Sequence, residues 1–194
     1  MRYLTNHSTG KMGYAVARAA AMRGADVTLI HGPTALPPVK FTEDVPITTA
    51  QDMYEAVTSR FADMDILVMA AAVADYRPAT VADDKIKKKD GDLSIPVERT
   101  ADILGTIGPR KTKQFLCGFS METRDMVENS AAKLKKKNLD MVVANNLKVS
   151  GAGFGVDTNV VTFITPDGTR ELPLMSKADV ADAILDEILK RRGH

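Results

Sequence analysis

Residues 2–30 read RYLTNHSTGKMGYAVARAAAMRGADVTLI, and their pattern is the strongest indication of the fold class. Its pattern predicts a strand at residues 2–5, a polar turn with glycines at residues 6–13, an alanine-rich helix at residues 14–23 and a second strand at residues 25–30. A strand, a glycine turn, a helix and a strand form the βαβ unit that opens a doubly wound sheet. The backbone N–H groups at the start of such a helix favour an anion.

The rest of the chain continues the alternation of strands and helices. Apolar runs predict strands at residues 45–48, 65–70, 93–97, 115–119 and 139–144. Helical spacing predicts helices at residues 49–61, 101–107 (capped by Thr100), 125–137 and 176–192. The turn Pro166-Asp-Gly168 predicts a hairpin of residues 159–164 and 169–174. The expected fold is therefore α/β: a doubly wound, Rossmann-like, mostly parallel sheet with a flap at about residues 75–98 and a small β-hairpin extension.

The bulk composition narrows the class of protein. With 194 residues, a single domain over residues 1–194 is expected. The formal net charge of +1 gives no general attraction to nucleic acid or to a membrane surface. No apolar run is long enough to cross a bilayer and no signal peptide opens the chain, which predicts a cytoplasmic protein. Because residue 2 already lies in a predicted strand, we expect a domain cut from a longer polypeptide.

The single cysteine, Cys117, lies in the apolar run at residues 115–119. A catalytic thiol would need a histidine base nearby in the fold, and the chain has three histidines. The apolar setting favours a buried thiol over a catalytic one.

The opening turn raises a rival function, a nicotinamide-dependent oxidoreductase. A dinucleotide site needs glycines in G-x-G-x-x-G spacing and an acidic residue at the end of the second strand. Residues 9–13 hold only a truncated form of this motif, and the second strand closes with Ile30-His-Gly32. No tyrosine is followed four residues later by a lysine, as a short-chain reductase requires, and Lys11 is not in a Walker motif. The sequence therefore disfavours this alternative.

Polar and basic residues cluster after the predicted strands. Lys133 and Lys137 are four apart and share a helix face, which is either a solvated helix end or a site for a bridging anion such as a triphosphate. The lysine run at residues 85–89 follows a central strand in a polar segment of about 20 residues, a length typical of lids, although it could be a plain surface run. Asp75 either forms a turn or contacts a ligand, and Asn6 either caps the first helix or holds a substrate oxygen.

Five motifs, in this order and spacing, resemble the phosphopantothenoylcysteine synthetase family. They are TNHSTGKMG (residues 5–13), AAVADYRPA (71–79), KIKK (85–88), GFSMET (118–123) and KNLDMVVANN (137–146). In many bacteria this family forms the C-terminal half of a bifunctional coenzyme A biosynthesis protein. The resemblance implies a ligase that joins 4′-phosphopantothenate to L-cysteine, with CTP and Mg²⁺, through an acyl-cytidylate. It also implies a homodimer, fused to or excised from a decarboxylase half, with no flavin in this chain.

The resemblance assigns roles by motif position. Lys85 becomes a catalytic cation of the flap, Asn6 holds the acyl-cytidylate and the phosphopantothenate end, and Ala72 contacts phosphopantothenate. Mg²⁺ is bound through the triphosphate. The remaining residues contact CTP together with Lys85: Met69, Ala70, Ala71, Asp75, Thr100, Ala101, Asp102, Ile103, Phe119, Lys133 and Lys137.

One position departs from the family pattern. Ala101 stands where the family often has the proline of N-P-D-I or T-P-D-I, a mild loss of backbone restriction beside the retained Asp102. Eukaryotic relatives accept ATP, so the preference for CTP depends on the bacterial form of the motifs. The runner-up function is a non-catalytic nucleotide-binding or regulatory domain in which Lys85 is only a surface charge.

Overall fold

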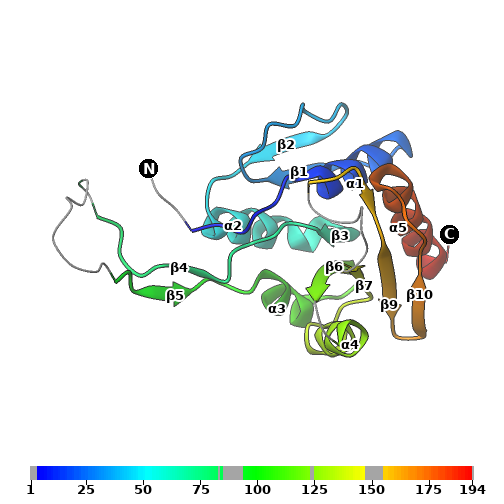
Figure 1. The fold of residues 1–194 in the computed structure, drawn as a ribbon. Coiled ribbons are helices and arrows are strands. Elements are labelled where there is room, and N and C mark those ends of the chain that lie inside the picture. Colours follow the sequence, from blue (N-terminus) through cyan, green and yellow to red (C-terminus); the bar gives the residue numbers. More distant parts are fainter. Residues whose placement is uncertain (1–3, 83, 85–93, 123–124, 147–154, 194) are drawn as a thin grey trace.

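A computed structural model describes residues 4–82, 84, 94–122, 125–146 and 155–193 (Figure 1). Its helices are α1 (Lys11–Met22), α2 (Ala50–Arg60), α3 (Ile103–Ile107), α4 (Met126–Lys136) and α5 (Lys177–Arg192), with 3₁₀ turns at Phe61–Asp63 and Gly108–Arg110. Its strands are β1 (Thr28–His31), β2 (Glu43–Pro46), β3 (Ile66–Met69), β4 (Tyr76–Pro78), β5 (Val97–Arg99), β6 (Phe115–Glu122), β7 (Met141–Asn146), β8 (Thr158–Asn159), β9 (Val161–Thr165), β10 (Gly168–Glu171) and β11 (Met175–Ser176). No helix in this described part is long and apolar enough to cross a bilayer.

The main sheet has the strand order β10-β9-β7-β6-β3. Strands β3, β6 and β7 are parallel, with Val68 opposite Cys117 and Cys117 opposite Met141. Strands β9 and β10 complete the sheet as an antiparallel hairpin, with Thr165 opposite Gly168. The predicted hairpin is therefore confirmed, and it extends the main sheet at one edge.

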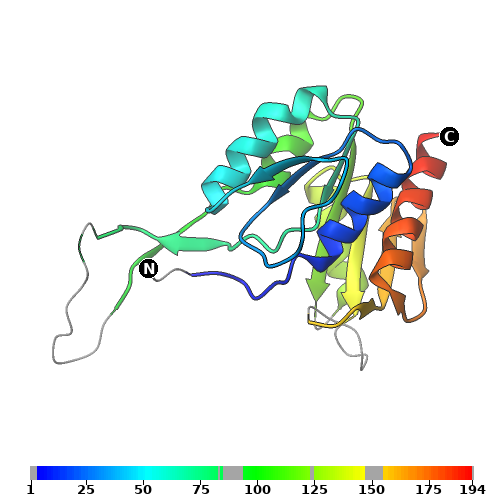
Figure 2. The ribbon, with the colours of Figure 1, turned by 90° about the horizontal axis from the view of Figure 1, so that it is seen from above.

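Successive side chains of the central strands point to opposite faces of the sheet, and each face packs against helices. Cys117 and Val143 belong to a buried cluster with residues of α1 and α5. Leu116 and Val142 belong to a second cluster with residues of α2, α3 and α4. Figure 2 shows α1 and α5 side by side on one face of the sheet. Helices on both faces of a largely parallel sheet confirm the predicted α/β, doubly wound fold class.

For residues 4 and 5, the part of the predicted opening strand that the structure describes, the prediction is wrong. Leu4 and Thr5 belong to no strand, and Leu4 is 50% exposed. Strand β1 pairs instead with β2 in a separate parallel ladder. A run with one large aliphatic side chain, followed by five polar residues, buries too little apolar surface to hold a strand in place.

Strands β4 and β5 pair as an antiparallel ribbon that reaches away from the body (Figure 1). The return strand expected at residues 93–97 is shifted to Val97–Arg99. Pro96 has no N–H to donate to a strand ladder, and its carbonyl oxygen accepts a hydrogen bond from the N–H of Ala79. The ribbon forms the base of the predicted flap. Residue 83 and residues 85–93, which include Lys85, lie outside the described residues.

Cys117 has no exposed surface, as the sequence predicted. Burial raises the pKa of its thiol far above the ordinary value, and the charge of Asp140 raises it further. We expect the folded protein to resist Ellman's reagent at neutral pH, because the thiolate is the reactive form. The same chain in concentrated guanidinium chloride should release one equivalent of chromophore. Fast labelling in native buffer would contradict this buried environment.

Candidate active site

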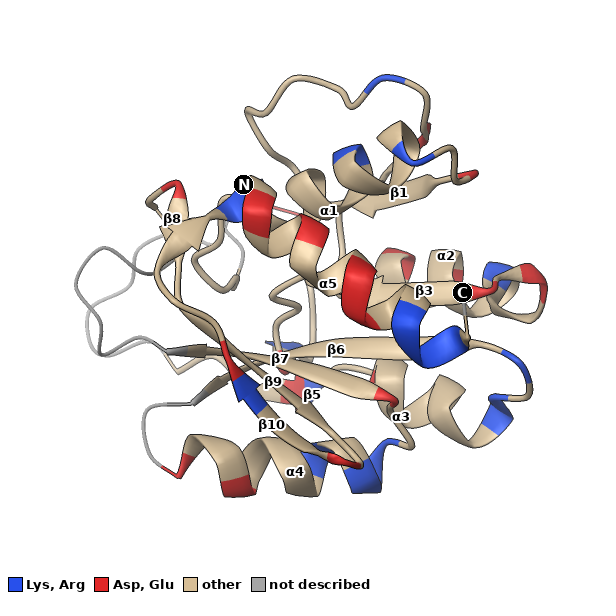
Figure 3. Cartoon of the chain, turned by 90° about the vertical axis from the view of Figure 1, so that its right-hand side faces the viewer, with Lys and Arg blue, Asp and Glu red and all other residues tan. Residues whose placement is uncertain are grey.

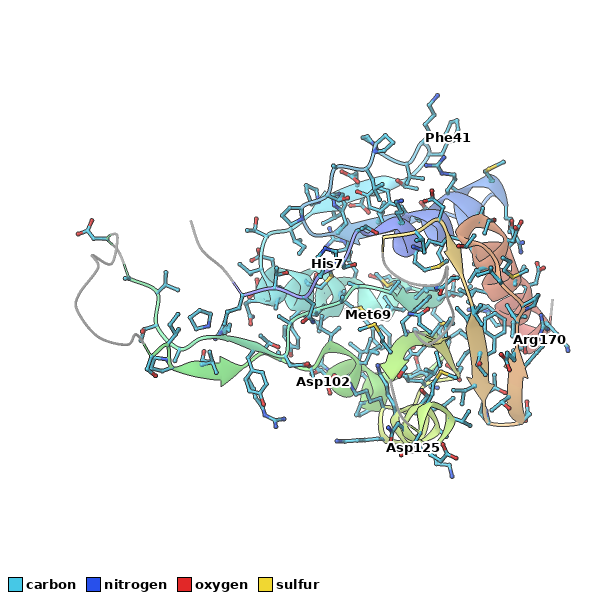
Figure 4. All side chains as sticks on the ribbon, viewed as in Figure 1. His7, Phe41, Met69, Asp102, Asp125 and Arg170 are labelled. Carbon is cyan, nitrogen blue, oxygen red and sulfur yellow. The ribbon has the colours of Figure 1, made fainter. Side chains whose placement is uncertain are left out.

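A cavity of about 450 Å³ opens where β3 ends, beside Phe119 of the neighbouring strand β6. Parallel α/β sheets bind ligands at this carboxyl edge, because loops and helix ends converge there. Its walls come from five parts of the chain: the end of β3 with the loop after it, the base of the β4–β5 ribbon, the start of α3, Phe119 of β6, and α4 with its C-terminal end. Figure 4 shows Met69 at the end of β3 and Asp102 before α3, two residues of this lining.

Lys133 and Lys137 form the basic wall of the cavity. Both lie on α4 or at its end and both line the cavity, so the shared helix face predicted from their spacing is confirmed. The Nζ atom of Lys133 donates to the carbonyl oxygen of Phe119 at 2.6 Å. The Nζ atom of Lys137 lies 2.9 Å from a carboxylate oxygen of Asp102. Figure 3 shows the basic residues gathered at this end of α4.

Asp102 connects that wall to α3. Its carboxylate accepts a hydrogen bond from the N–H of Gly105 at 2.9 Å and so caps the helix. Burial favours the neutral carboxyl, but the Gly105 amide and then the charges of Lys137 and Lys133 outweigh it, so the pKa of Asp102 is lowered. At neutral pH this carboxylate is therefore ionised and faces the two lysines.

The predicted cap of this helix, Thr100, is wrong. The hydroxyl of Thr100 donates to the carbonyl oxygen of Ala74 at 2.6 Å, and its N–H donates to the carbonyl oxygen of Asp75 at 3.0 Å. The Thr100 side chain thus links the end of β5 to the loop after β3. This contact fixes the floor of the cavity.

Gly108 fixes the position of Lys137 relative to α3. A Cβ atom on Gly108 would lie 2.1 Å from the carbonyl oxygen of Lys137, so only glycine allows this approach. The side-chain amide of Asn138 donates to the carbonyl oxygen of Gly108 at 3.0 Å. The end of α4 is therefore packed directly against the 3₁₀ turn that follows α3.

Gly108→Ala should lower the free energy of unfolding by about 2–3 kcal/mol, because the new methyl group must displace a backbone carbonyl. Gly32→Ala is the matched control, since nothing lies within 4 Å of the Cβ it would add. Urea unfolding followed by circular dichroism measures both. Equal stability of the two variants would contradict the close approach between Gly108 and Lys137.

Most of the predicted nucleotide contacts meet at this cavity. Met69, Ala71, Asp75, Thr100, Ala101, Asp102, Ile103, Phe119, Lys133 and Lys137 line it. Ala70, Ala72 and Asn6 are not part of the lining.

Asn6 does not cap α1, whose N-cap is Gly10. Its side-chain amide instead donates to the carbonyl oxygens of Ala72 at 3.3 Å and Val73 at 3.1 Å. It therefore holds the loop after β3 from outside the cavity.

Some lining residues were not predicted from the sequence: Val73, Ala74, Tyr76, Arg99 and Leu104. Leu104 follows directly on the predicted residues that begin α3, so extending that segment by one residue would have found it. Tyr76 and Arg99 are 23 positions apart, and their adjacency depends on the pairing of β4 with β5. No local sequence pattern indicates that pairing at this register.

Comparison with known proteins identifies the family. Residues 1–191 match the model of the DNA/pantothenate metabolism flavoprotein C-terminal domain. The chain belongs to this family. It is 51% identical to the coenzyme A biosynthesis bifunctional protein CoaBC of Bacillus subtilis, over 97% of this chain and 47% of that protein. The chain thus spans about half the length of the curated relatives that it matches.

Two solved structures share the fold of this chain. The C-terminal domain of a CoaBC protein superposes with a TM-score of 0.82 at 43% identity, covering 97% of this chain and 85% of the other. A mutant of Cab2 in complex with phosphopantothenate-cysteine has a TM-score of 0.81 at 17% identity, covering 100% of this chain and 80% of the other. The resemblance read from the five motifs is confirmed at the level of the family.

Proposed function

We propose that this chain is a phosphopantothenate–cysteine ligase that uses CTP in coenzyme A biosynthesis. The observation that carries the proposal is the cavity at the carboxyl edge of the sheet, where Lys133 and Lys137 face Asp102 and the end of β3. Two cations at such an edge suit the phosphates of a nucleotide. The relationship to the C-terminal half of CoaBC proteins supports the same activity.

The first chemical step activates the acid. A carboxylate oxygen of 4′-phosphopantothenate attacks the α-phosphorus of Mg–CTP, the bond from that phosphorus to the bridging oxygen breaks, and pyrophosphate leaves. Negative charge builds on the phosphate oxygens, and positioned cations stabilise it. In this proposal Lys133 exchanges the carbonyl oxygen of Phe119 for a phosphate oxygen, and Lys137 binds a second phosphate while Asp102 keeps it in place. Mg²⁺ enters as part of the nucleotide substrate.

The second step forms the amide. The amine of L-cysteine attacks the carbonyl carbon of the acyl-cytidylate, the bond to the phosphate oxygen breaks, and CMP leaves as the nitrogen loses a proton to solvent. The carbonyl groups of Ala72 and Val73 are oriented by Asn6. Asn6 thereby shapes the backbone beside which the acyl group is proposed to bind.

The proposal is tested by mixing 4′-phosphopantothenate, L-cysteine and Mg–CTP with the chain. We expect pyrophosphate release to require phosphopantothenate, and CMP release to require cysteine as well. Replacing CTP with ATP tests the base preference. A non-catalytic nucleotide-binding domain would bind CTP but release no pyrophosphate when phosphopantothenate is added, and that result would reject the ligase.

Two further expectations belong to this proposal. The homodimer and the link to a decarboxylase half remain predictions. The link to a decarboxylase half is supported by the bifunctional nature of the CoaBC relatives. Sedimentation of the chain across a range of concentrations measures whether it forms a dimer. A monomer with full ligase activity would contradict a site that the partner subunit completes.

A further inference from the structure

Arg99 lies at the rim of the cavity on strand β5. In the β4–β5 ladder it stands directly opposite Tyr76, and its guanidinium carbon lies 5.8 Å from the centre of the tyrosine ring. Residues directly opposite each other in an antiparallel pair share one face of the ribbon. Arg99 therefore places a cation over the Tyr76 ring beside the cavity, at a distance suited to cation–π attraction.

The neighbouring pair of the same ribbon shows a different arrangement. Arg77 stands opposite Glu98, and its Nε atom lies 2.8 Å from the Glu98 carboxylate. Because side chains alternate along a strand, this pair lies on the other face, and neither residue lines the cavity. The ribbon thus carries one arginine neutralised by a carboxylate and one arginine directed to the cavity.

The charges of the cavity single out Arg99. Its cations are Arg99, Lys133 and Lys137, and its carboxylates are Asp75 and Asp102. Lys137 is paired with Asp102, and Lys133 donates to a backbone carbonyl. Within the described residues, no carboxylate lies within ion-pair distance of Arg99. The guanidinium carbon of Arg99 lies over the Tyr76 ring, and the planar fork of N–H groups of a guanidinium matches a phosphate group.

The base of the ribbon holds Arg99 in place. The next residue, Thr100, makes two hydrogen bonds to the loop after β3, through its hydroxyl to Ala74 and its N–H to Asp75. The ring of Tyr76 supports the side chain from the opposite strand. The cation is therefore oriented before any ligand arrives, which reduces the entropy lost on binding.

We propose that Arg99, oriented by Tyr76, is a phosphate-binding residue of this cavity. The proposal rests on the proposed function, and it assigns the contact to the β- and γ-phosphates of the nucleotide, because Arg99 shares the cavity with Lys133 and Lys137. The phosphate of phosphopantothenate has the same chemistry, and the experiment separates the two sources.

The test compares Arg99→Gln with Arg77→Gln, which removes an arginine from the other face of the same ribbon. Isothermal titration with CTP, CDP and CMP should show a loss of about 10-fold in CTP affinity for Arg99→Gln, the scale of one charge-assisted hydrogen bond. The loss should shrink from CTP to CMP, and Arg77→Gln should bind as the wild type does. Arg99→Lys should recover part of the affinity. Tyr76→Leu should weaken CTP binding several-fold, whereas Tyr76→Phe, which keeps the ring, should not.

Each outcome has a distinct meaning. Unchanged CTP affinity in Arg99→Gln overturns the inference, and if this variant also makes phosphopantothenoylcysteine at the wild-type rate the proposed function stands. A raised KM for phosphopantothenate with an unchanged CTP affinity overturns the assignment to the nucleotide. A wild-type chain that binds CTP but releases no pyrophosphate rejects the ligase alone. A wild-type chain that does not bind CTP rejects both.

Discussion

Lys137→Ala should weaken CTP binding by about 100-fold, close to 3 kcal/mol. The substitution removes a cation from the cavity wall, and it also leaves the Asp102 carboxylate without the ammonium group that lies 2.9 Å away. The triphosphate then meets an uncompensated negative charge. Lys133→Ala should have a smaller effect, because it leaves the ion pair between Lys137 and Asp102 in place.

The double variant Lys137→Ala/Asp102→Asn tests this reasoning. It should regain about 5-fold in CTP affinity over Lys137→Ala, because it removes the unpaired charge while asparagine still caps α3. Lys136→Ala is the matched control: Lys136 is exposed on the same helix, does not line the cavity, and should change the affinity by less than about 2-fold. If Lys136→Ala and Lys137→Ala lose the same amount of CTP affinity, the basic wall is not part of the nucleotide site.

Lys85→Gln should lower turnover by more than about 100-fold, since a catalytic cation that stabilises transition-state charge contributes a few kcal/mol. This prediction comes from the family motif KIKK, because Lys85 lies outside the described residues. CTP affinity should change far less than turnover, as expected for a contact made in the transition state. Stopped-flow measurement of pyrophosphate release, with CTP titration beside it, separates the two quantities.

The control for that variant is Lys89→Gln, which alters the same lysine run outside the motif. It should retain near-normal turnover. If Lys85→Gln behaves like Lys89→Gln, the run is a surface charge and the catalytic role of Lys85 is wrong. The alternative of a non-catalytic nucleotide-binding domain then gains support.

Local patterns were sufficient for most of the fold. The apolar run around Cys117 predicted a buried strand, and the spacing of Lys133 and Lys137 predicted a shared helix face; both are confirmed. Such signals succeed because they depend on neighbours within one or two turns of the same element. The expected strand at Leu4 and Thr5 failed, because a strand exists only when another strand pairs with it.

The order and type of the main elements, the family, and the set of polar residues available at the strand ends all follow from the amino-acid sequence. Which of those residues meet depends on how the chain packs in three dimensions. This packing pairs Asp102 with Lys137, 35 residues away, gives the cap of α3 to Asp102 instead of Thr100, and sets Arg99 over Tyr76. The physical reason is that each of these contacts depends on the register of distant segments, which is fixed by the burial of the whole sheet and carries no signature in any local stretch.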